Sequence, residues 1–347
     1  MTDQMSELFA RTPRPENTSL RCEQCGAPLS SSSAEGCLNC LLLGGPEESN
    51  PRSRRFQHYE ICLREDGIAF DELGRGAMGV TYRAQDLNLG ALVALKVIQA
   101  SFSANAGTRE RFRREACAAA QLRHPNVATV FYYGETASGQ CFYAMELVEG
   151  ETLEARIRRE GPMPATLALE VAIQVATALL AAEAHRLVHR DLKPSNLMVV
   201  ANDSSEPDRV VVKVIDFGLA KVAIVNPADA TQTSENFSGT PDFASPEQFS
   251  AGQASLDIRS DIYSLGATLW YLLCGSAPFE DRSPIKARLG RLPSEQLSAA
   301  HVPWPVIVLL RTMLAPDPQE RPQSARELLT ALERCREIIA NPSFVFR

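Results

Sequence analysis

Hydrophobic and polar residues follow two different patterns along the chain. Between residues 59 and 148, short apolar runs of strand length are separated by polar or glycine-containing turns. One stretch with the spacing of an amphipathic helix, 108–122, interrupts them. From residue 149 to residue 340, most apolar residues recur at helical spacing. We therefore expect one continuous folded unit in which a small sheet with one helix precedes a mostly helical part.

The pattern gives approximate bounds for these elements. We expect a five-stranded sheet in the first part, made of residues 68–74, 79–85, 92–98, 128–135 and 141–148. In the second part we expect long helices at 165–186, 260–275, 303–315 and 324–339. Short strands are expected between the first two of these helices, around Leu197–Val200 and Val211–Ile215. The fold class that follows is α+β with two lobes, at 59–148 and 149–340.

The first 58 residues differ in composition from the rest. Residues 1–20 are polar, contain two prolines and are expected to be disordered. Residues 21–43 hold four cysteines, and residues 44–58 mix Gly, Pro, Ser and charge as linkers do. We therefore divide the chain into a disordered start, a cysteine-rich segment, a linker and a folded domain at 59–340.

Composition and charge narrow the class of protein. Apolar residues make up 45% of the chain and charged residues 22%, as in ordinary globular proteins. The net charge of −7 argues against nucleic-acid binding by the chain as a whole. The N-terminus has no apolar stretch of signal-peptide length, and the nearest candidate for a membrane span, Ile262 to Cys274, is too short. We expect a cytoplasmic protein that contacts no membrane.

A glycine-rich turn is the first candidate for chemistry. Leu73 precedes Gly74, Gly76 and Gly79, which form the pattern G-x-G-x-x-G. Strand signals on both sides predict a hairpin, whereas a dinucleotide-binding fold would place such glycines between a strand and a helix. Glycines let backbone amides approach phosphate oxygens with no side chain between them. Taken alone, the pattern fits an ordinary glycine hairpin equally well.

A lysine in an apolar strand is the second candidate. Lys96 ends the run Val93-Ala94-Leu95-Lys96, and burying its charge is costly unless it meets an anion. Phosphates could supply that anion, and so could a carboxylate on the following helix. Glu115 lies 19 residues later, next to alanines on the inward side of that helix. We therefore predict an ion pair between Lys96 and Glu115.

The segment HRDLKPSN, residues 189–196, gathers polar groups between an apolar helix and a short strand. Asp191 can accept a proton from an attacking hydroxyl, and Lys193 can neutralise charge that grows on a transferred phosphoryl group. Asn196 offers an oxygen to a hard cation such as Mg²⁺. Asp216 follows 25 residues after Asp191, at the end of a predicted strand and before Phe-Gly, where it fits a second Mg²⁺ ligand.

Taken in order, the glycine loop, VALK, the helix glutamate, HRDLKPSN, DFG and SPE resemble the eukaryotic-type protein kinase family. The resemblance covers about residues 66–335, and the local sequences GRGAMG, LRHPNV and SDIYSLG are similar to those of bacterial serine/threonine kinases. It implies a bilobal protein kinase fold that uses ATP with Mg²⁺ or Mn²⁺. It also implies that the γ-phosphoryl group is transferred to serine or threonine hydroxyls of protein substrates, as the LKPSN sequence around Lys193 indicates.

The resemblance assigns a role to each motif residue. Lys96, held by Glu115, is expected to bind the α- and β-phosphates, Asp191 to be the catalytic base, and Asn196 and Asp216 to hold Mg²⁺. The other expected nucleotide contacts are Leu73, Gly74, Gly76, Gly79, Thr81, Ala94, the gatekeeper Met145, and Glu146 to Val148 of the hinge.

The resemblance also implies two structural contacts and a mode of control. Asp261 is expected to brace the catalytic loop, and Glu247 to pair with Arg321. In the family, an arginine at the position of Arg190 goes with control by phosphorylation of the activation segment. We expect autophosphorylation in trans within a homodimer. The expected sites are Thr231, Thr233 and Ser234, and Ser238 is a further candidate.

The cysteine-rich segment predicts a metal site. Cys22 and Cys25 form one CxxC pair, Cys37 and Cys40 form another, and eleven residues separate the pairs, as in a zinc ribbon with four thiolate ligands. Thiolates favour Zn²⁺ over Mg²⁺, and the metal would stabilise a segment too short for its own core. Free cysteines in a disordered tail, or a redox or disulfide set, are the alternatives. With Arg21 its only basic residue, the segment fits a protein partner better than nucleic acid.

Two other functions fit parts of the pattern. A pseudokinase scaffold would bind partners without transferring phosphate, but Lys96, Asp191, Asn196 and Asp216 are all present. A small-molecule phosphotransferase could share the fold, but the segment GTPDFASPEQ is typical of protein kinases. An active serine/threonine protein kinase is therefore the leading hypothesis.

Overall fold

The computed structural model describes residues 54–76, 78–100, 106–200, 210–217, 241–249, 256–279 and 292–341. The chain divides into two compact units, Met1–Ser53 and Arg54–Arg347, and the described residues all belong to the second. The predicted zinc ribbon and the candidate phosphorylation sites between residues 231 and 238 lie outside the described residues.

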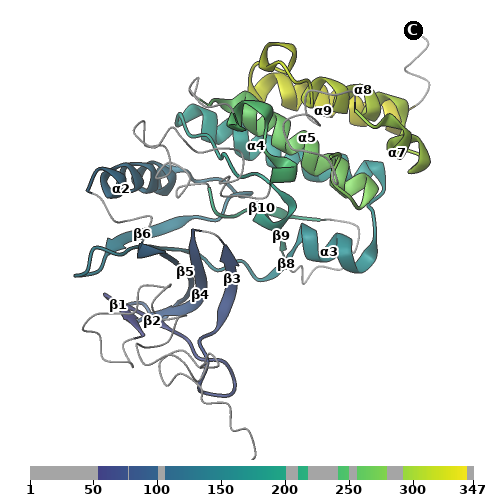
Figure 1. Cartoon of the computed structure of the whole chain (residues 1–347). Helices are drawn as coiled ribbons and strands as arrows, with labels where there is room; N and C mark the ends of the chain where they lie inside the picture. The colour runs from purple at the N-terminus through teal and green to yellow at the C-terminus, as the bar shows by residue number, and fades with distance from the viewer. Residues whose placement is uncertain are drawn as a thin grey trace, which may run out of the picture. The chain divides into compact units, whose positions relative to one another are not determined.

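A seven-stranded antiparallel sheet forms the first part of the unit (Figure 1). Its order is β1-β2-β4-β5-β7-β6, and β3 pairs with β4 across the glycine turn that joins them. The strands are β1 (Arg55–Phe56), β2 (Tyr59–Ile61), β3 (Glu72–Gly76), β4 (Gly79–Asp86), β5 (Leu92–Ile98), β6 (Val130–Glu135) and β7 (Cys141–Glu146).

The sheet differs from the predicted one in two ways. All five predicted strands are present, although the first begins at Glu72 and not at Ile68. Strands β1 and β2 were not predicted, and β1 lies inside the segment assigned to the linker at 44–58. These strands have two and three residues, which is too short for a period-2 pattern to show.

The central strand β5 is buried on both faces, which explains its nearly continuous apolar sequence. Val93, Leu95 and Val97 pack into one cluster on the outer face, whereas Ala94 and Ile98 belong to the main core. Because side chains alternate along a strand, Lys96 lies on the same face as Ala94 and Ile98. Helix α2 (Ala106–Gln121) packs beside β6 through one buried side that includes Phe112.

The second part of the unit is mostly helical, and the four long helices predicted there are present. Helices α4 and α5 run through it, with α9 packed against α4 and α8 against α5 (Figure 1). The helices are α3 (Leu153–Glu160), α4 (Ala165–Ala184), α5 (Ile258–Cys274), α7 (Ser294–Ala299), α8 (Trp304–Met313) and α9 (Ala325–Ala340). A three-stranded sheet in the order β10-β9-β8 completes it, with β8 (Gly150–Thr152), β9 (Leu197–Val200) and β10 (Val212–Val214).

Helix α4 is the one helix among the described residues that is long and apolar enough to cross a membrane by length and composition, with a mean hydropathy of 1.8. Helix α4 fits these two criteria better than Ile262 to Cys274, the nearest candidate from the sequence pattern. Its apolar residues are largely buried in the core, between α5 and α9. Burial inside the protein therefore accounts for its composition.

A buried ion pair connects the segment before α5 to the C-terminal helices, as predicted. The Arg321 side chain is 0% exposed, and its two terminal nitrogens donate to the Glu247 carboxylate at 2.7 and 3.0 Å. Arg321 also donates to three backbone carbonyls, so its charge is fully hydrogen-bonded. Burial raises the pKa of Glu247, but the hydrogen bonds from Arg321 and Ser260 outweigh burial and leave that pKa below its usual value.

We predict that Glu247→Gln lowers the free energy of unfolding by roughly 3 kcal/mol, because breaking a buried pair leaves Arg321 without its counter-charge. The folded-state pKa of Glu247 is lowered, so its contribution is complete above the unfolded value of about 4.3. The contribution is lost as the pH falls through the folded-state pKa. Urea unfolding between pH 3 and pH 7 measures both effects.

Glu170→Gln is the matched control for this prediction. Glu170 pairs with Arg336 at 2.9 Å, and both side chains are 42% exposed. Exposed ion pairs contribute about 0–1 kcal/mol to the free energy of unfolding, so this variant should be nearly as stable as the wild type. The prediction would be contradicted if both variants lost the same free energy of unfolding. It would also be contradicted if the loss in Glu247→Gln were the same at pH 3 and pH 7.

Candidate active site

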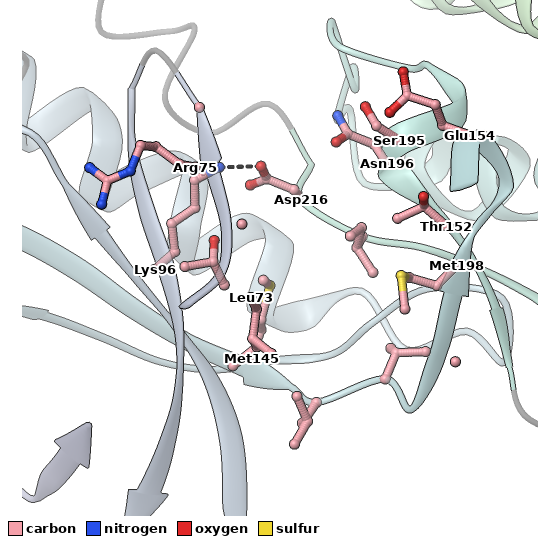
Figure 2. A pocket seen from close by; sticks show the side chains of 18 of the residues that line it. Leu73, Arg75, Lys96, Met145, Thr152, Glu154, Ser195, Asn196, Met198 and Asp216 are labelled. Atoms are coloured by element: carbon pink, nitrogen blue, oxygen red, sulfur yellow. Dashed lines mark hydrogen bonds and ion pairs between the residues drawn. The ribbon is translucent and has the colours of Figure 1, made fainter. Parts of the chain in front are cut away.

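A cleft of about 800 Å³ lies between the strands of the first part and the loops of the second. Residues from β3, β4, β5 and β7 line one side, and residues from the loop before β9 and the end of β10 line the other (Figure 2). Fourteen of the residues singled out in the sequence meet here: Leu73, Gly74, Gly76, Gly79, Thr81, Ala94, Lys96, Met145, Glu146, Val148, Asp191, Lys193, Asn196 and Asp216. Glu115 is not among the lining residues.

The three glycines of the turn are required for different reasons. A Cβ at Gly79 would lie 2.2 Å from the Val97 carbonyl oxygen, so the pairing of β4 with β5 excludes a side chain there. A Cβ at Gly74 or at Gly76 would meet no atom within 4 Å. The fold itself therefore does not demand glycine at these two positions. The open space above β3 fits a bound group that must approach the backbone closely.

The far end of the cleft is apolar and ends at a hinge. Ala94 on β5 faces Met145 on β7 in register. Both the backbone and the side chain of the next residue, Glu146, are held in place. Its N–H donates to the Thr129 carbonyl at 2.8 Å, and its carboxylate pairs with Lys213 at 2.7 Å. The Val148 N–H donates to no described residue. Apolar side chains beside an available backbone donor fit an adenine ring.

Lys96 reaches across the cleft to Asp216 and pairs with its Oδ2 atom, as the dashed line in Figure 2 marks. The predicted ion pair between Lys96 and Glu115 is absent from the described residues, and this prediction is wrong for the structure. Glu115 lies at the border of the buried face of α2 and stays partly exposed. The rings of Phe112 and Tyr143, with centroids 6.0 Å apart, fill the space between α2 and the sheet.

Tyr143 is a site residue that the sequence analysis missed. Its hydroxyl donates to Asp216 Oδ1, so both oxygens of Asp216 are occupied from the sheet side. Burial, followed by the negative charge of Asp216, raises the pKa of Tyr143 well above its usual value, so the hydroxyl keeps its proton. Tyr143 pairs with Lys96 across β5 and β7, and the sequence pattern alone does not determine this register.

The catalytic-loop residues are held together by short contacts. Lys193 Nζ lies 3.1 Å from Asp191 Oδ2. The Asn196 amide nitrogen donates to the Asp191 carbonyl at 2.7 Å and to its carboxylate at 3.2 Å. The Asn196 amide oxygen accepts no hydrogen bond from a described residue. Asn196 therefore supports Asp191 with its nitrogen and can offer its oxygen to a cation.

The buried carboxylate of Asp261 on α5 anchors this loop, as predicted. Asp261 is 0% exposed, and its two oxygens accept the backbone N–H groups of His189 at 2.6 Å and Arg190 at 2.8 Å. Arg190 has a φ of +66° and Asp216 a φ of +60°, both in the left-handed region that costs a non-glycine residue on the order of 1–3 kcal/mol. Such conformations persist where the surrounding contacts hold them, and here they coincide with the site.

A second link to the loop was not predicted. Gln248 donates from Nε2 to the Arg190 carbonyl at 2.9 Å, and its Oε1 accepts the Ser245 N–H at 2.8 Å. Arg190 is thus held through its N–H by α5 and through its carbonyl by the segment 245–248. Nothing in the sequence indicates this contact, since a glutamine is an ordinary residue in a turn.

Asn196 and Asp216 are the protein groups that fit Mg²⁺. They come from the same side of the cleft, Asn196 from the loop before β9 and Asp216 from the end of β10, and Figure 2 labels both side chains. No group of three or more metal-binding side chains occurs among the described residues. Two protein oxygens are nevertheless sufficient here, because Mg²⁺ in nucleotide sites is usually completed by phosphates and water. The donor set therefore fits a nucleotide-bound Mg²⁺.

A family model for the protein kinase domain matches residues 69–332. The chain belongs to the protein kinase family. Two relatives are similar over 75% and 76% of this kinase: the serine/threonine-protein kinase pkn3 of Myxococcus xanthus is 36% identical over 268 residues, and PknB of Mycobacterium leprae is 37% identical over 273 residues. These alignments cover 48% and 42% of the relatives, so the kinase spans less than half the length of the curated proteins it matches.

The fold agrees with solved structures. The kinase domain of PknI from Mycobacterium tuberculosis superposes with a TM-score of 0.63 at 27% identity, over 81% of this kinase and 97% of the PknI domain. The bilobal kinase fold expected from the motifs is therefore confirmed.

The glycine turn gives a prediction that separates folding from binding. Gly79→Ala should destabilise the kinase by about 1–3 kcal/mol, because the new methyl group collides with β5. Gly76→Ala should change stability by less than about 0.5 kcal/mol, since its methyl group meets open space. Thermal unfolding without nucleotide measures both. A Gly76→Ala protein that is as unstable as Gly79→Ala would show that the fold, and not a ligand, requires both glycines.

Proposed function

We propose that the chain is a serine/threonine protein kinase that uses ATP with Mg²⁺ or Mn²⁺ to phosphorylate serine or threonine hydroxyls of proteins. The observation that carries this proposal is the meeting of Lys96, Asp191, Asn196 and Asp216 in one cleft. The names of the bacterial relatives, which are serine/threonine kinases, support it.

The chain's own residues would position groups and balance charge. Asp191 would accept the proton of the substrate hydroxyl, and its carboxylate is oriented for this by Lys193 and Asn196. Lys193 lies beside Asp191 and would neutralise charge on the transferred phosphoryl group. A bound Mg²⁺, held by Asn196 and Asp216, would supply further neutralisation of the phosphates.

Lys96 would have to change partner when nucleotide binds. It pairs with Asp216 in the structure, yet its proposed role is to bind the α- and β-phosphates. Its side chain is only 11% exposed, so water solvates the charge poorly and one anion or the other must balance it. Exchange of Asp216 for phosphate keeps Lys96 paired and releases an Asp216 oxygen for the cation.

Asp191→Asn tests the catalytic assignment. We predict that transfer of γ-labelled phosphate from ATP to the chain itself and to a generic basic protein falls by on the order of 10²–10⁴ without its general base. Asp66→Asn, in an exposed turn away from the cleft, should leave the rate unchanged. Nucleotide binding without any label in the wild type would favour a pseudokinase scaffold, and equal rates for wild type and Asp191→Asn would refute the proposed base.

We also propose that the kinase controls itself by autophosphorylation in trans, with a second copy as its partner. Arg190, which precedes Asp191, would bind the added phosphate. Unlabelled wild type would be mixed with the Asp191→Asn protein as substrate, and label on the inactive copy would reveal transfer between chains. The expected sites on that copy are Thr231, Thr233 and Ser234.

The cysteine-rich segment is proposed to be a zinc ribbon that binds a protein partner. The support is the spacing of Cys22, Cys25, Cys37 and Cys40, which suits a closed tetrahedral site. Four thiolates leave no position for a substrate, so the site would be structural and would serve recruitment or regulation.

Metal analysis of the purified chain tests the zinc site. We predict about one Zn²⁺ per chain for a Cys₄ site, and its loss in a Cys25→Ser, Cys40→Ser double variant. Cys117→Ser is the control, because Cys117 is an exposed cysteine on α2 outside the cluster. A wild-type chain that is purified with zinc in the medium and still contains none would rule out the ribbon.

A further inference from the structure

The hydroxyl group of Tyr143 has one hydrogen-bond partner among the described residues, and that partner is Asp216. Tyr143 is 1% exposed, in the middle of β7, and its ring packs against Phe112 of α2. A hydroxyl at this depth cannot turn to water. If Asp216 moved away, the hydroxyl would be left buried without a partner, which is costly.

Lys96 and Tyr143 hold Asp216 in different ways. Lys96 pairs with Oδ2 and Tyr143 donates to Oδ1. The two residues face one another in the register of β5 and β7, so both contacts come from adjacent, rigid strands. Lys96 has a flexible stem and an alternative anion in the nucleotide phosphates. Tyr143 has neither, so its contact with Asp216 is the one that stays when Lys96 leaves.

We propose that Tyr143 is a positioning residue for Asp216, and this inference rests on the proposed kinase function. Its hydroxyl fixes Oδ1 and thereby keeps Asp216 turned into the cleft, so that Oδ2 would be available to a cation once Lys96 leaves. Asp216 needs such support, because its φ of +60° is a conformation that a non-glycine residue keeps only where surrounding contacts hold it. Tyr143 thus acts on Mg²⁺ binding through Asp216 and touches no substrate itself.

The test is the Mg²⁺ dependence of nucleotide binding in Tyr143→Phe, which keeps the ring and loses only the hydroxyl. ADP binding is measured by titration calorimetry with a series of Mg²⁺ concentrations and again with EDTA. The Mg²⁺ concentration for half-maximal enhancement of ADP affinity should rise about tenfold, as expected for loss of one hydrogen bond to a charged acceptor. The affinity for ADP in EDTA should stay within about twofold, because the apolar slot and Lys96 are unchanged.

Tyr133→Phe is the matched control. Tyr133 lies on the neighbouring strand β6, packs against the same Phe112 ring and donates its hydroxyl to Glu135 at 2.6 Å, away from Asp216. Its loss should leave the Mg²⁺ dependence at the wild-type value. The same shift in both variants would show a general effect of loosening the aromatic cluster and would overturn the inference.

A second readout needs no nucleotide. In the free protein, backbone amides of residues 215–217 should exchange hydrogen for deuterium faster in Tyr143→Phe than in the wild type or in Tyr133→Phe. Unchanged exchange together with an unchanged Mg²⁺ dependence would show that Tyr143 only packs. Tighter Mg²⁺ binding in Tyr143→Phe would show that the hydroxyl holds Asp216 away from the cation, which is the opposite of the inference.

ADP binding by the wild-type protein shows whether the proposed kinase function or only the role of Tyr143 is wrong. If wild-type protein binds no ADP with or without Mg²⁺, the proposed kinase function fails and the inference fails with it. If the wild type binds ADP in a Mg²⁺-dependent way and Tyr143→Phe behaves identically, only the role of Tyr143 is refuted.

Discussion

The active site depends first on one buried carboxylate. Asp261 lies on α5 with no exposed surface, and each of its oxygens accepts the N–H group of one of two consecutive loop residues, His189 and Arg190. A buried charge is tolerated only when it is hydrogen-bonded, so this arrangement stabilises the loop and the helix together. Because Arg190 is held in the left-handed region, the chain turns sharply there and directs Asp191 into the cleft.

The first turn of α5 is also where other parts of the domain meet. Its cap, Asp257, accepts the N–H of Arg259 at 2.9 Å and so fixes where the helix begins. The Arg259 carbonyl accepts Arg321, and Ser260 donates to Glu247, so the buried ion pair rests on the same turn. Gln248, next to Glu247, reaches the Arg190 carbonyl. The end of the activation segment and the catalytic loop are therefore positioned by one short stretch of helix.

The sequence was most informative where a motif residue has one possible partner nearby. Asp261 and the pair of Glu247 with Arg321 were predicted by family resemblance and are present, because each is a buried charge that must be satisfied locally. The partner of Lys96 was predicted wrongly, because two carboxylates compete for it and the outcome depends on how α2 packs against the sheet. Tyr143 was missed since a tyrosine in an apolar strand has the pattern of a core residue, and only the tertiary structure places its hydroxyl on Asp216.

The competition for Lys96 is an electrostatic consequence of the cleft itself. Asp216 and Glu115 are both acidic, whereas the nucleotide would bring more negative charge than either. Attraction between charges in a partly buried site is several times stronger than in water, so Lys96 should follow the largest negative charge available to it. In the structure the carboxylate that Lys96 contacts is Asp216. Phosphates in the cleft would draw Lys96 away, and Tyr143 would then be the sheet residue that still holds Asp216. The hydrogen bond from the uncharged Tyr143 hydroxyl to Asp216 remains, because a hydroxyl is not attracted to the phosphates as the Lys96 ammonium group is.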